Sequence, residues 1–234
     1  MSLPIFYIDS FIEASTVLTL SEETSKHVVQ VLRMENGEQL QLTDGKGHVI
    51  TAEIIDNHKK KCQVKLISIQ DFKKPEKRIT IAISLVKNAS RFEWFLEKAT
   101  ELGATSIIPM LCQRTEKQHF RMERMNGILI SAMLQSKQSW LPVLHTPTLY
   151  SEVIMKADEN NKFIAHCEAD EEKIQLAGIQ KNGSSVILIG PEGDFTAEEI
   201  TLALNHQFMP VALGETRLRT ETAGIVAATL LNLY

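Results

Sequence analysis

Apolar and polar positions alternate with a period of two through much of the first seventy residues. The alternation recurs in three segments, residues 39–43, 48–55 and 63–69. Strands that bury one face have this period, and the glycine-containing turn at residues 44–47 joins the first two segments as a hairpin turn does. Upstream, Ser21 is placed to cap a brief helix. The pattern predicts a small β-barrel or curled sheet over residues 1–72.

Residues 71–77 break this pattern. The stretch Asp71-Phe72-Lys73-Lys74-Pro75-Glu76-Lys77 is charged, contains a proline and has no period. Such a stretch is typical of a connection between domains. We therefore predict two domains, residues 1–72 and residues 73–234.

From Arg78 onward, short apolar runs alternate with longer segments of helical period. The apolar runs predict strands at residues 79–85, 106–111, 162–167, 186–189 and 211–213. Helices are predicted between them, and two should begin at capping boxes, Ser90 with Glu93 and Thr196 with Glu199. A final helix is expected at residues 221–233. Strands and helices in alternation predict an α/β fold, a mostly parallel sheet with helices on both faces.

Two polar turns follow the last two predicted strands. Gly190-Pro191-Glu192-Gly193 comes after one strand, and Arg219-Thr220-Glu221-Thr222 lies between the other and the final helix. Ligands of open parallel sheets bind at the carboxyl ends of strands, and glycine lets the backbone approach a ligand closely. Buried polar groups also need partners, which a ligand can supply. We expect both turns to be walls of one small-molecule site.

The motifs of several common ligand classes are missing. No GxGxxG follows the first strand and no GxxxxGK[ST] occurs, which argues against a nicotinamide cofactor or a P-loop nucleotide. Cys62, Cys112 and Cys167 are far apart and odd in number. This spacing predicts buried free thiols rather than disulfides, and it suggests no metal site.

Composition adds little to this picture. The 234 residues are 44% hydrophobic, enough for a packed core, and contain no apolar run long enough to cross a membrane. The first four residues lack the layout of a signal peptide, so we expect a cytoplasmic protein. A formal net charge of -4 gives no overall sign of nucleic-acid binding. Any RNA must therefore meet a local basic patch.

The two polar turns resemble the motifs of a known family. Ile189-Gly190-Pro191-Glu192-Gly193 and Leu213-Gly214-x-x-x-Leu218-Arg219-Thr220-Glu221-Thr222-Ala223 are similar to those of the small-subunit ribosomal RNA uridine-N3 methyltransferases of the SPOUT superfamily. Residues 27–33 and 44–47 resemble that family's N-terminal PUA-like RNA-binding barrel, and residues 97–103 its first catalytic-domain helix. The resemblance covers essentially the whole chain. It departs at Gln138, where the family usually has an arginine.

The resemblance implies a fold, a cofactor and partners. The fold is a SPOUT-type, C-terminal trefoil-knotted parallel sheet behind a PUA-like barrel. The cofactor is S-adenosylmethionine, held by three loops, and the partners are small-subunit (16S) ribosomal RNA or the 30S particle and a second copy of the chain. The implied cofactor-binding residues are His166, Cys167, Ile189, Gly190, Glu192, Gly193, Leu213, Gly214, Leu218, Arg219, Thr220, Thr222 and Ala223.

Methyl transfer to uracil N3 requires that the imide proton be lost and that the resulting charge be stabilised. Arg219, and Arg114 if its loop folds over the site, are candidates for stabilising the anion. Glu221 is a candidate base, or a carboxylate that orients Arg219. The residues expected to contact RNA are Arg33, Lys59, Lys60, Lys61, Arg114 and Lys137. Lys137 is also a candidate for the role of the arginine missing at position 138.

Two other functions stay open at this point. Within enzymes, the alternative is methylation of a ribose 2'-hydroxyl in RNA. In a different class, the chain would be a noncatalytic RNA-binding factor in ribosome assembly. The product formed on small-subunit RNA separates all three.

Overall fold

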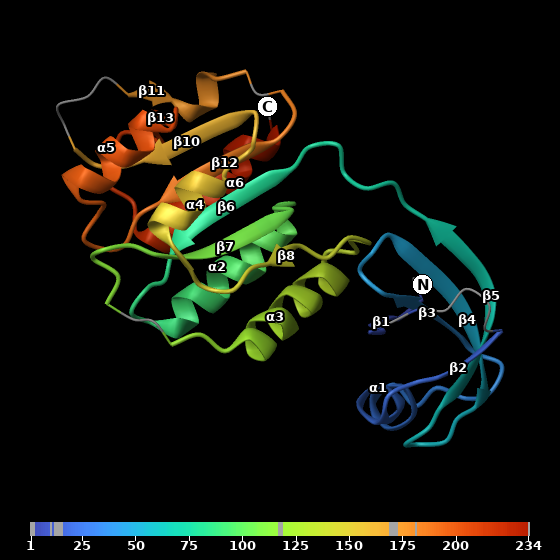
Figure 1. The fold of residues 1–234 in the computed structure, drawn as a ribbon. Coiled ribbons are helices and arrows are strands. Elements are labelled where there is room, and N and C mark those ends of the chain that lie inside the picture. Colours follow the sequence, from blue (N-terminus) through green and yellow to red (C-terminus); the bar gives the residue numbers. More distant parts are fainter. Residues whose placement is uncertain are drawn as a thin grey trace. The chain divides into compact units, whose positions relative to one another are not determined.

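The computed structural model describes residues 3–9, 11, 16–116, 119–168, 173–180 and 182–233. It divides into two compact units (Figure 1). The first comprises Met1–Lys74 and Met133–Leu141, and the second comprises Pro75–Ala132 and Pro142–Tyr234. Each unit has its own hydrophobic core.

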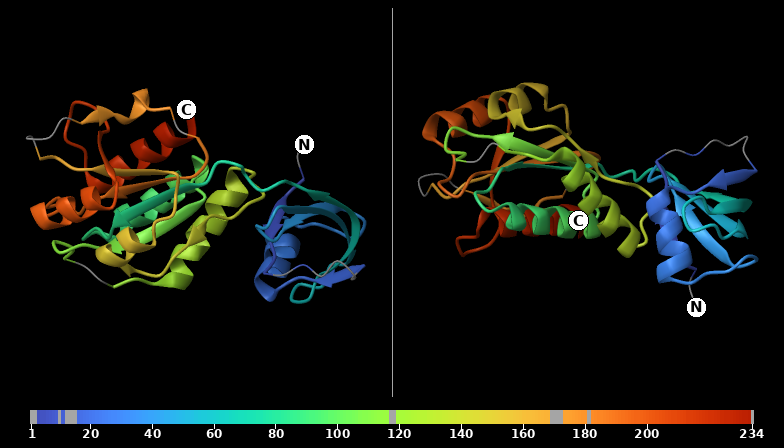
Figure 2. Two further views of the ribbon diagram at one scale, coloured as in Figure 1. Left: turned by 45° about the horizontal axis from the view of Figure 1, so that its top comes forward. Right: turned by 90° about the horizontal axis from the view of Figure 1, so that it is seen from below.

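The first unit is built on a curled five-stranded sheet in the order β1-β3-β4-β5-β2 (Figure 2). Its strands are β1 (Ile5–Tyr7), β2 (Val17–Thr19), β3 (Gln39–Thr43), β4 (His48–Asp56) and β5 (Gln63–Asp71). The pairings are antiparallel except that of β1 with β3. Apolar residues of the period-two pattern, such as Leu40, Leu42 and Ile50, are fully buried. The predicted curled sheet is therefore confirmed.

A short helical segment packs within this unit. It consists of α1 (Glu22–Lys26) and a π-helix, η1 (His27–Val31). Ser21 caps it as predicted, since its Oγ accepts a hydrogen bond from the Thr24 N–H at 3.1 Å. Ser25 then ties the segment to the sheet, because its Oγ accepts from the Cys62 N–H at 3.0 Å.

Met133–Leu141, from the middle of the chain, belongs to the first unit. The indole Nε1 of Trp140 donates to the carbonyls of Phe72 and Lys73, both at 3.1 Å. The Leu141 N–H donates to the Gly45 carbonyl at 2.8 Å. Gly47, with φ +97°, lies so close to the Trp140 ring that an added Cβ would clash at 2.6 Å. The glycines of this turn therefore serve close packing against a distant segment.

The second unit is an α/β domain. Its strands are β6 (Ile79–Ser84), β7 (Ser106–Leu111), β8 (Val143–Leu144), β9 (Thr148–Leu149), β10 (Asn161–Ala165), β11 (Ile174–Gln175), β12 (Ser185–Ile189) and β13 (Met209–Ala212). They pair in parallel in the order β11-β13-β10-β12-β6-β7-β8, with β9 beside β7. Every residue of β6 and β12 is buried, as expected of central strands covered on both faces.

Helices cover both faces of this sheet (Figure 2, right). They are α2 (Ala89–Glu101), α3 (Met122–Gln135), α4 (Tyr150–Lys156), η2 (Leu176–Gly178), α5 (Ala197–Asn205) and α6 (Thr220–Leu233). α4 and α5 pack on one face, against Ala82, Ile164 and Leu188. α2 and α6 pack together on the other, where Gly224 of α6 approaches Phe95 and Ile83. The predicted α/β class is confirmed.

The structure corrects two local predictions. The predicted capping box at Ser90 and Glu93 was wrong. The N-cap of α2 lies two residues earlier, at Asn88, whose side chain accepts from the Ser90 N–H at 2.9 Å. Glu93 instead pairs with Arg124 at 2.5 Å. Cys62 and Cys112 are buried as predicted, but Cys167 is exposed. The second capping box, Thr196 with Glu199, is confirmed.

None of the helices in the described part of the chain is long and apolar enough to cross a membrane.

Candidate active site

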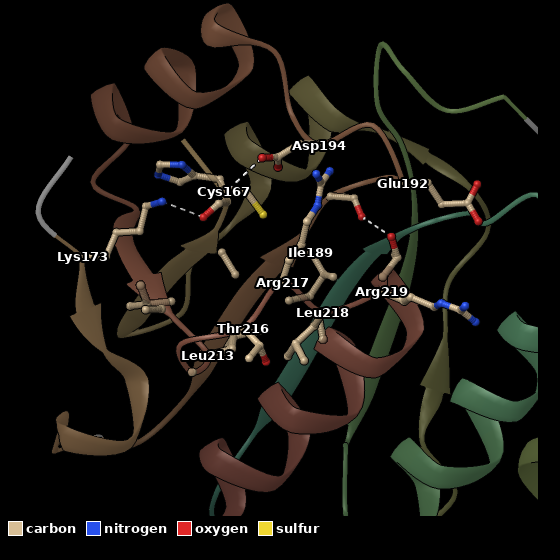
Figure 3. Close-up of a pocket in the computed structure, with 18 of the residues that line it drawn as sticks. Cys167, Lys173, Ile189, Glu192, Asp194, Leu213, Thr216, Arg217, Leu218 and Arg219 are labelled. Atoms are coloured by element: carbon tan, nitrogen blue, oxygen red, sulfur yellow. Dashed lines mark hydrogen bonds between the residues drawn. The ribbon is translucent and has the colours of Figure 1, made fainter. Parts of the chain in front are cut away.

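The ends of three neighbouring parallel strands form a pocket. β13, β10 and β12 lie side by side, so their carboxyl ends meet at one edge of the sheet. The loops that follow them enclose a pocket of about 730 Å³, a size suited to a nucleoside-sized ligand (Figure 3). This is where ligands bind open parallel sheets. Both polar turns singled out in the sequence contribute to its walls.

Most of the predicted cofactor-binding residues line this pocket. The members on its wall are His166, Cys167, Ile189, Gly190, Glu192, Leu213, Gly214, Leu218, Arg219, Thr220 and Ala223. Gly193 and Thr222 are not among the lining residues. The structure thus brings together segments more than fifty residues apart.

Thr220 joins the two sequence motifs. Its Oγ1 donates a hydrogen bond to the Gly190 carbonyl at 3.0 Å, and Thr220 is 5% exposed. The bond connects the first residue of α6 to the turn after β12. Because the hydroxyl and the carbonyl are buried, losing one leaves the other unsatisfied. Thr220 therefore fixes the spacing between two pocket walls.

Asp194 joins the turn after β12 to the end of β10, and sequence reasoning missed it. Its Oδ2 accepts from the Cys167 N–H at 2.7 Å and its Oδ1 from the Phe195 N–H at 2.9 Å. Its φ of 63° is in the left-handed region, where Asp is one of the tolerated residues. The only signal in the sequence is its place directly after Gly193, and a plain turn residue would look the same there.

Arg114 reaches the glycine-rich turn from the loop after β7. Its guanidinium donates through one nitrogen to the Gly193 carbonyl at 2.7 Å and to the Phe195 carbonyl at 3.3 Å. The same loop is held by Glu199, whose Oε1 accepts from the Gln113 N–H at 2.8 Å. In this geometry Arg114 holds the turn through two of its backbone carbonyls.

Three further cations lie on the pocket wall. Lys173 donates to the carbonyls of His166, at 2.8 Å, and Glu168. Arg217 and Arg219 are exposed and form no ion pair with any residue that the structure describes. In Figure 3 the side chain of Arg217 extends towards Asp194, whereas that of Arg219 extends to the other side, below Glu192. Lys173 and Arg217 were not predicted.

Glu221 has a cationic neighbour other than the predicted one. Its Oε1 lies 3.7 Å from Nε of Arg91, which is in the first turn of α2. The same guanidinium lies 3.7 Å from Oε1 of Glu192, on the pocket wall. Arg91 thus stands between a buried carboxylate and one that faces the pocket.

Two buried groups near these loops have shifted pKa values. Burial raises the pKa of the Cys112 thiol, and the Glu199 carboxylate adds to this. Burial likewise raises the pKa of the Tyr150 hydroxyl, which donates to the Glu199 carbonyl at 2.6 Å. Both groups therefore stay protonated near neutral pH and serve packing around α5. Within the described residues, no cluster of His, Cys, Asp or Glu could hold a metal ion.

The predicted RNA-contact residues other than Arg114 lie in the first unit. Arg33 is exposed with φ 56°, and Lys137 is exposed with φ 55°. Lys59, Lys60 and Lys61 form an exposed turn between β4 and β5. Lys60 is also 3.5 Å from Glu22, a loose surface pair that leaves its charge largely available.

Comparison with known proteins assigns the fold and the site to a class. The profile of the RNA methyltransferase domain family matches residues 73–232, and that of the RNA methyltransferase PUA domain matches residues 20–67. The pocket lies within the first match. The protein is thus an RNA methyltransferase with an N-terminal PUA domain.

Individual relatives narrow the class. Ribosomal RNA small subunit methyltransferase E from Synechocystis sp. is 31% identical over 230 residues, 96% of this chain and 75% of the relative. A probable rRNA-methyltransferase from Porphyromonas gingivalis, 37% identical, has a TM-score of 0.90 over 97% of this chain and 95% of its own. Ribosomal RNA small subunit methyltransferase E from Neisseria gonorrhoeae, solved bound to S-adenosyl methionine, is 30% identical with a TM-score of 0.85 and coverages of 97% and 95%. The chain belongs to the ribosomal RNA small subunit methyltransferase E family.

Proposed function

We propose that this protein transfers a methyl group from S-adenosylmethionine to N3 of a uridine in small-subunit (16S) ribosomal RNA. The observation that carries the proposal is the pocket at the ends of β10, β12 and β13, which gathers the two sequence motifs in a member of this enzyme family. Relatives from Legionella pneumophila and Neisseria gonorrhoeae, with TM-scores of 0.88 and 0.85, were solved with the same cofactor.

The pocket fits S-adenosylmethionine on its own geometry. Three chain segments line it with backbone as well as side chains, which suits adenine and ribose recognition by amides and carbonyls. At Gly190 an added Cβ would lie 3.1 Å from the Phe195 ring, so a side chain at this position would crowd that ring. Gly214, with φ +140°, requires glycine for its backbone conformation. On this basis we propose that the predicted cofactor-binding residues that line the pocket form the cofactor site.

The cofactor supplies an electrophilic methyl group, and the protein must supply the rest. The imide N3 of uracil carries a proton, so its lone pair becomes available only when that proton leaves. The negative charge then spreads onto O2 and O4 of the base. We propose that Arg219 stabilises this charge, since it lies on the pocket wall, is exposed and has no acidic partner among the described residues.

The surroundings of the other two residues expected in catalysis, Arg114 and Glu221, favour other roles. Arg114 is bound to two carbonyls of the glycine-rich turn, so we propose that it holds this turn in place for the cofactor. Glu221 is 5% exposed, which leaves little room for a nucleobase to reach its carboxylate. We therefore propose that Glu221 orients an arginine rather than accepting the proton, and its neighbour is Arg91.

Binding of the RNA is proposed to involve both domains, residues 1–72 and 73–234. We propose that the exposed cations Arg33, Lys59–Lys61 and Lys137 contact phosphates, which position RNA without reading its sequence. We further propose the 30S particle as substrate, a homodimer as the active form, a trefoil knot at the C-terminal strands and a cytoplasmic location.

The proposal is tested by incubating the protein with methyl-labelled S-adenosylmethionine and unmodified 30S particles, then identifying the modified nucleoside by mass spectrometry. We expect N3-methyluridine. A 2'-O-methylated nucleoside would show ribose methylation instead, and an unmodified RNA despite bound cofactor would indicate a noncatalytic factor.

A further inference from the structure

Arg91 stands between two carboxylates at the edge of the cofactor pocket. Its Nε lies 3.7 Å from Oε1 of Glu221, and another of its nitrogens lies 3.7 Å from Oε1 of Glu192. Both distances exceed those of hydrogen bonds. The guanidinium is thus attracted to both acids, yet its N–H donors are not used by them.

The burial of these three side chains differs sharply. Glu221 is 5% exposed, and its Oε2 has no hydrogen-bond partner among the residues that the structure describes. The Arg91 side chain is 39% exposed and that of Glu192 is 44% exposed. A buried carboxylate is costly without a nearby cation, so Glu221 holds Arg91 at this position. The exposed part of the guanidinium is then available to a substrate.

We propose that Arg91 is a catalytic residue that donates hydrogen bonds to a carbonyl oxygen of the target uracil and stabilises its N3 anion, with Glu221 as its positioning residue. This inference rests on the proposed function, methylation at N3. Arg91 approaches Glu192, on the pocket wall, from α2, whereas Arg219 lines the pocket from the residue before α6. Two arginines from different elements match the two carbonyl oxygens, O2 and O4, that share the charge.

The step balances without any additional group from the protein. The N3 proton passes to water or hydroxide, and the N3 electron pair forms the new bond to the methyl carbon. The bond between that carbon and sulfur breaks, and sulfur keeps the electron pair. A planar guanidinium suits this role because it is always charged and presents several donors in fixed geometry. The guanidinium lowers the free energy of the N3 anion and so raises the fraction of bound uracil that is ionised and able to react.

Other cations of the site are less suited to this task. Arg114 and Lys173 already donate to backbone carbonyls. Arg217 extends towards Asp194, on the side of the pocket where β10 ends. Arg91 alone among these has acidic side chains on two sides, which fix the position of its charge.

The test compares Arg91→Ala, Arg91→Lys and Lys98→Ala. Lys98 lies on the same helix two turns later and pairs with Glu97 and Glu101 away from the pocket, so it controls for loss of a helix cation. S-adenosylhomocysteine affinity, kcat and the pH profile of methyl transfer are measured for each protein. Formation of N3-methyluridine by the wild type is established first, so that a failure of the proposed function is recognised separately.

We expect Arg91→Ala to bind S-adenosylhomocysteine as the wild type does and to lose about 100-fold in kcat. Its rate should recover as pH rises, because alkaline solution ionises the imide without help from the enzyme. Arg91→Lys keeps a charge beside both carboxylates, so it should fold normally and lose about 10-fold. Lys98→Ala should match the wild type.

Two results would overturn the inference. One is a kcat of Arg91→Lys and Arg91→Ala equal to that of Lys98→Ala. The other is a loss in kcat that does not diminish with pH, or that follows a loss of cofactor affinity or of thermal stability, because Arg91 would then act through the fold.

Discussion

Asp194 offers the sharpest test of how the pocket is held together. Its carboxylate binds the Cys167 N–H at 2.7 Å and the Phe195 N–H at 2.9 Å, and the first of these bonds connects two pocket loops. Asp194→Asn keeps the size of the side chain but replaces one acceptor by a donor. Asp194→Gly removes the side chain and suits the φ of 63° better. Asp194→Asn therefore changes only the side-chain clamp, the pair of hydrogen bonds to Cys167 and Phe195, whereas Asp194→Gly removes the clamp and the backbone strain together.

The magnitude follows from the two bonds. A hydrogen bond to a charged group contributes about 1.5–3 kcal/mol, and because the bond to Cys167 is exposed we take the lower value, about 1.5 kcal/mol. Without this bond the loop at Cys167 is free, and the cofactor must order it on binding. The loss of about 1.5 kcal/mol then weakens cofactor binding about tenfold. In Asp194→Gly the release of left-handed strain returns about 1 kcal/mol to the folded protein. This variant loses both hydrogen bonds, together about 3 kcal/mol, so its free energy of unfolding should fall by about 2 kcal/mol relative to the wild type.

Calorimetric titration with S-adenosylhomocysteine and urea unfolding measure the two effects. We expect both variants to bind about tenfold more weakly. Gln207→Gly is the matched control, because Gln207 also has a positive φ, 65°, but lies outside the pocket. It should gain slightly in stability and bind normally. Wild-type affinity in Asp194→Asn would refute the clamp.

Three further outcomes follow from particular contacts. Thr220→Val loses the hydrogen bond to the Gly190 carbonyl, so its free energy of unfolding should fall by about 1–2 kcal/mol, and it should bind S-adenosylhomocysteine several-fold more weakly. Thr229→Val is the control: the bond it loses stays within α6, so it should bind normally. Gly224→Ala places a Cβ 2.6 Å from the Phe95 ring and should lower the free energy of unfolding, measured in urea, by about 1–3 kcal/mol. Gly127→Ala, with open space around it, should raise it by about 0.5–1 kcal/mol, and equal effects of the two changes would contradict this packing. Although burial acts to raise the pKa of Asp44, hydrogen bonds from His48 and the Lys46 N–H lower it overall, so its stabilisation is present above about pH 4 and lost as pH falls through the lowered pKa; the stability gap between wild type and Asp44→Asn in urea melts should close in acid.

Sequence patterns predicted the secondary structure well where periodicity reflects burial. The predicted strand at residues 186–189 is a continuous apolar run and the one at 79–85 is mostly apolar, and both β12 and β6 are buried throughout. The strands β8, β9 and β11 were not predicted, because each has two residues, too few to show a period. The Ser90 cap failed because Asn88, two residues earlier, is an equally good cap and the sequence does not rank them.

The candidate site was predicted in part for a similar reason. Strand ends and glycine-rich turns identified the walls after β12 and β13, because such turns are recognisable locally. Asp194, Arg217 and Arg91 could not be found in this way. Their roles depend on which segments meet in space, and Arg91 lies 130 residues before Glu221, which it contacts.

The central claim is that the three strand-end loops form a methyl-donor pocket, and calorimetric titration of the wild-type protein with S-adenosylhomocysteine tests it most directly. We predict saturable binding that Asp194→Asn and Thr220→Val weaken and that Gln207→Gly leaves unchanged. Absence of heat and of any thermal shift at millimolar ligand would contradict the account.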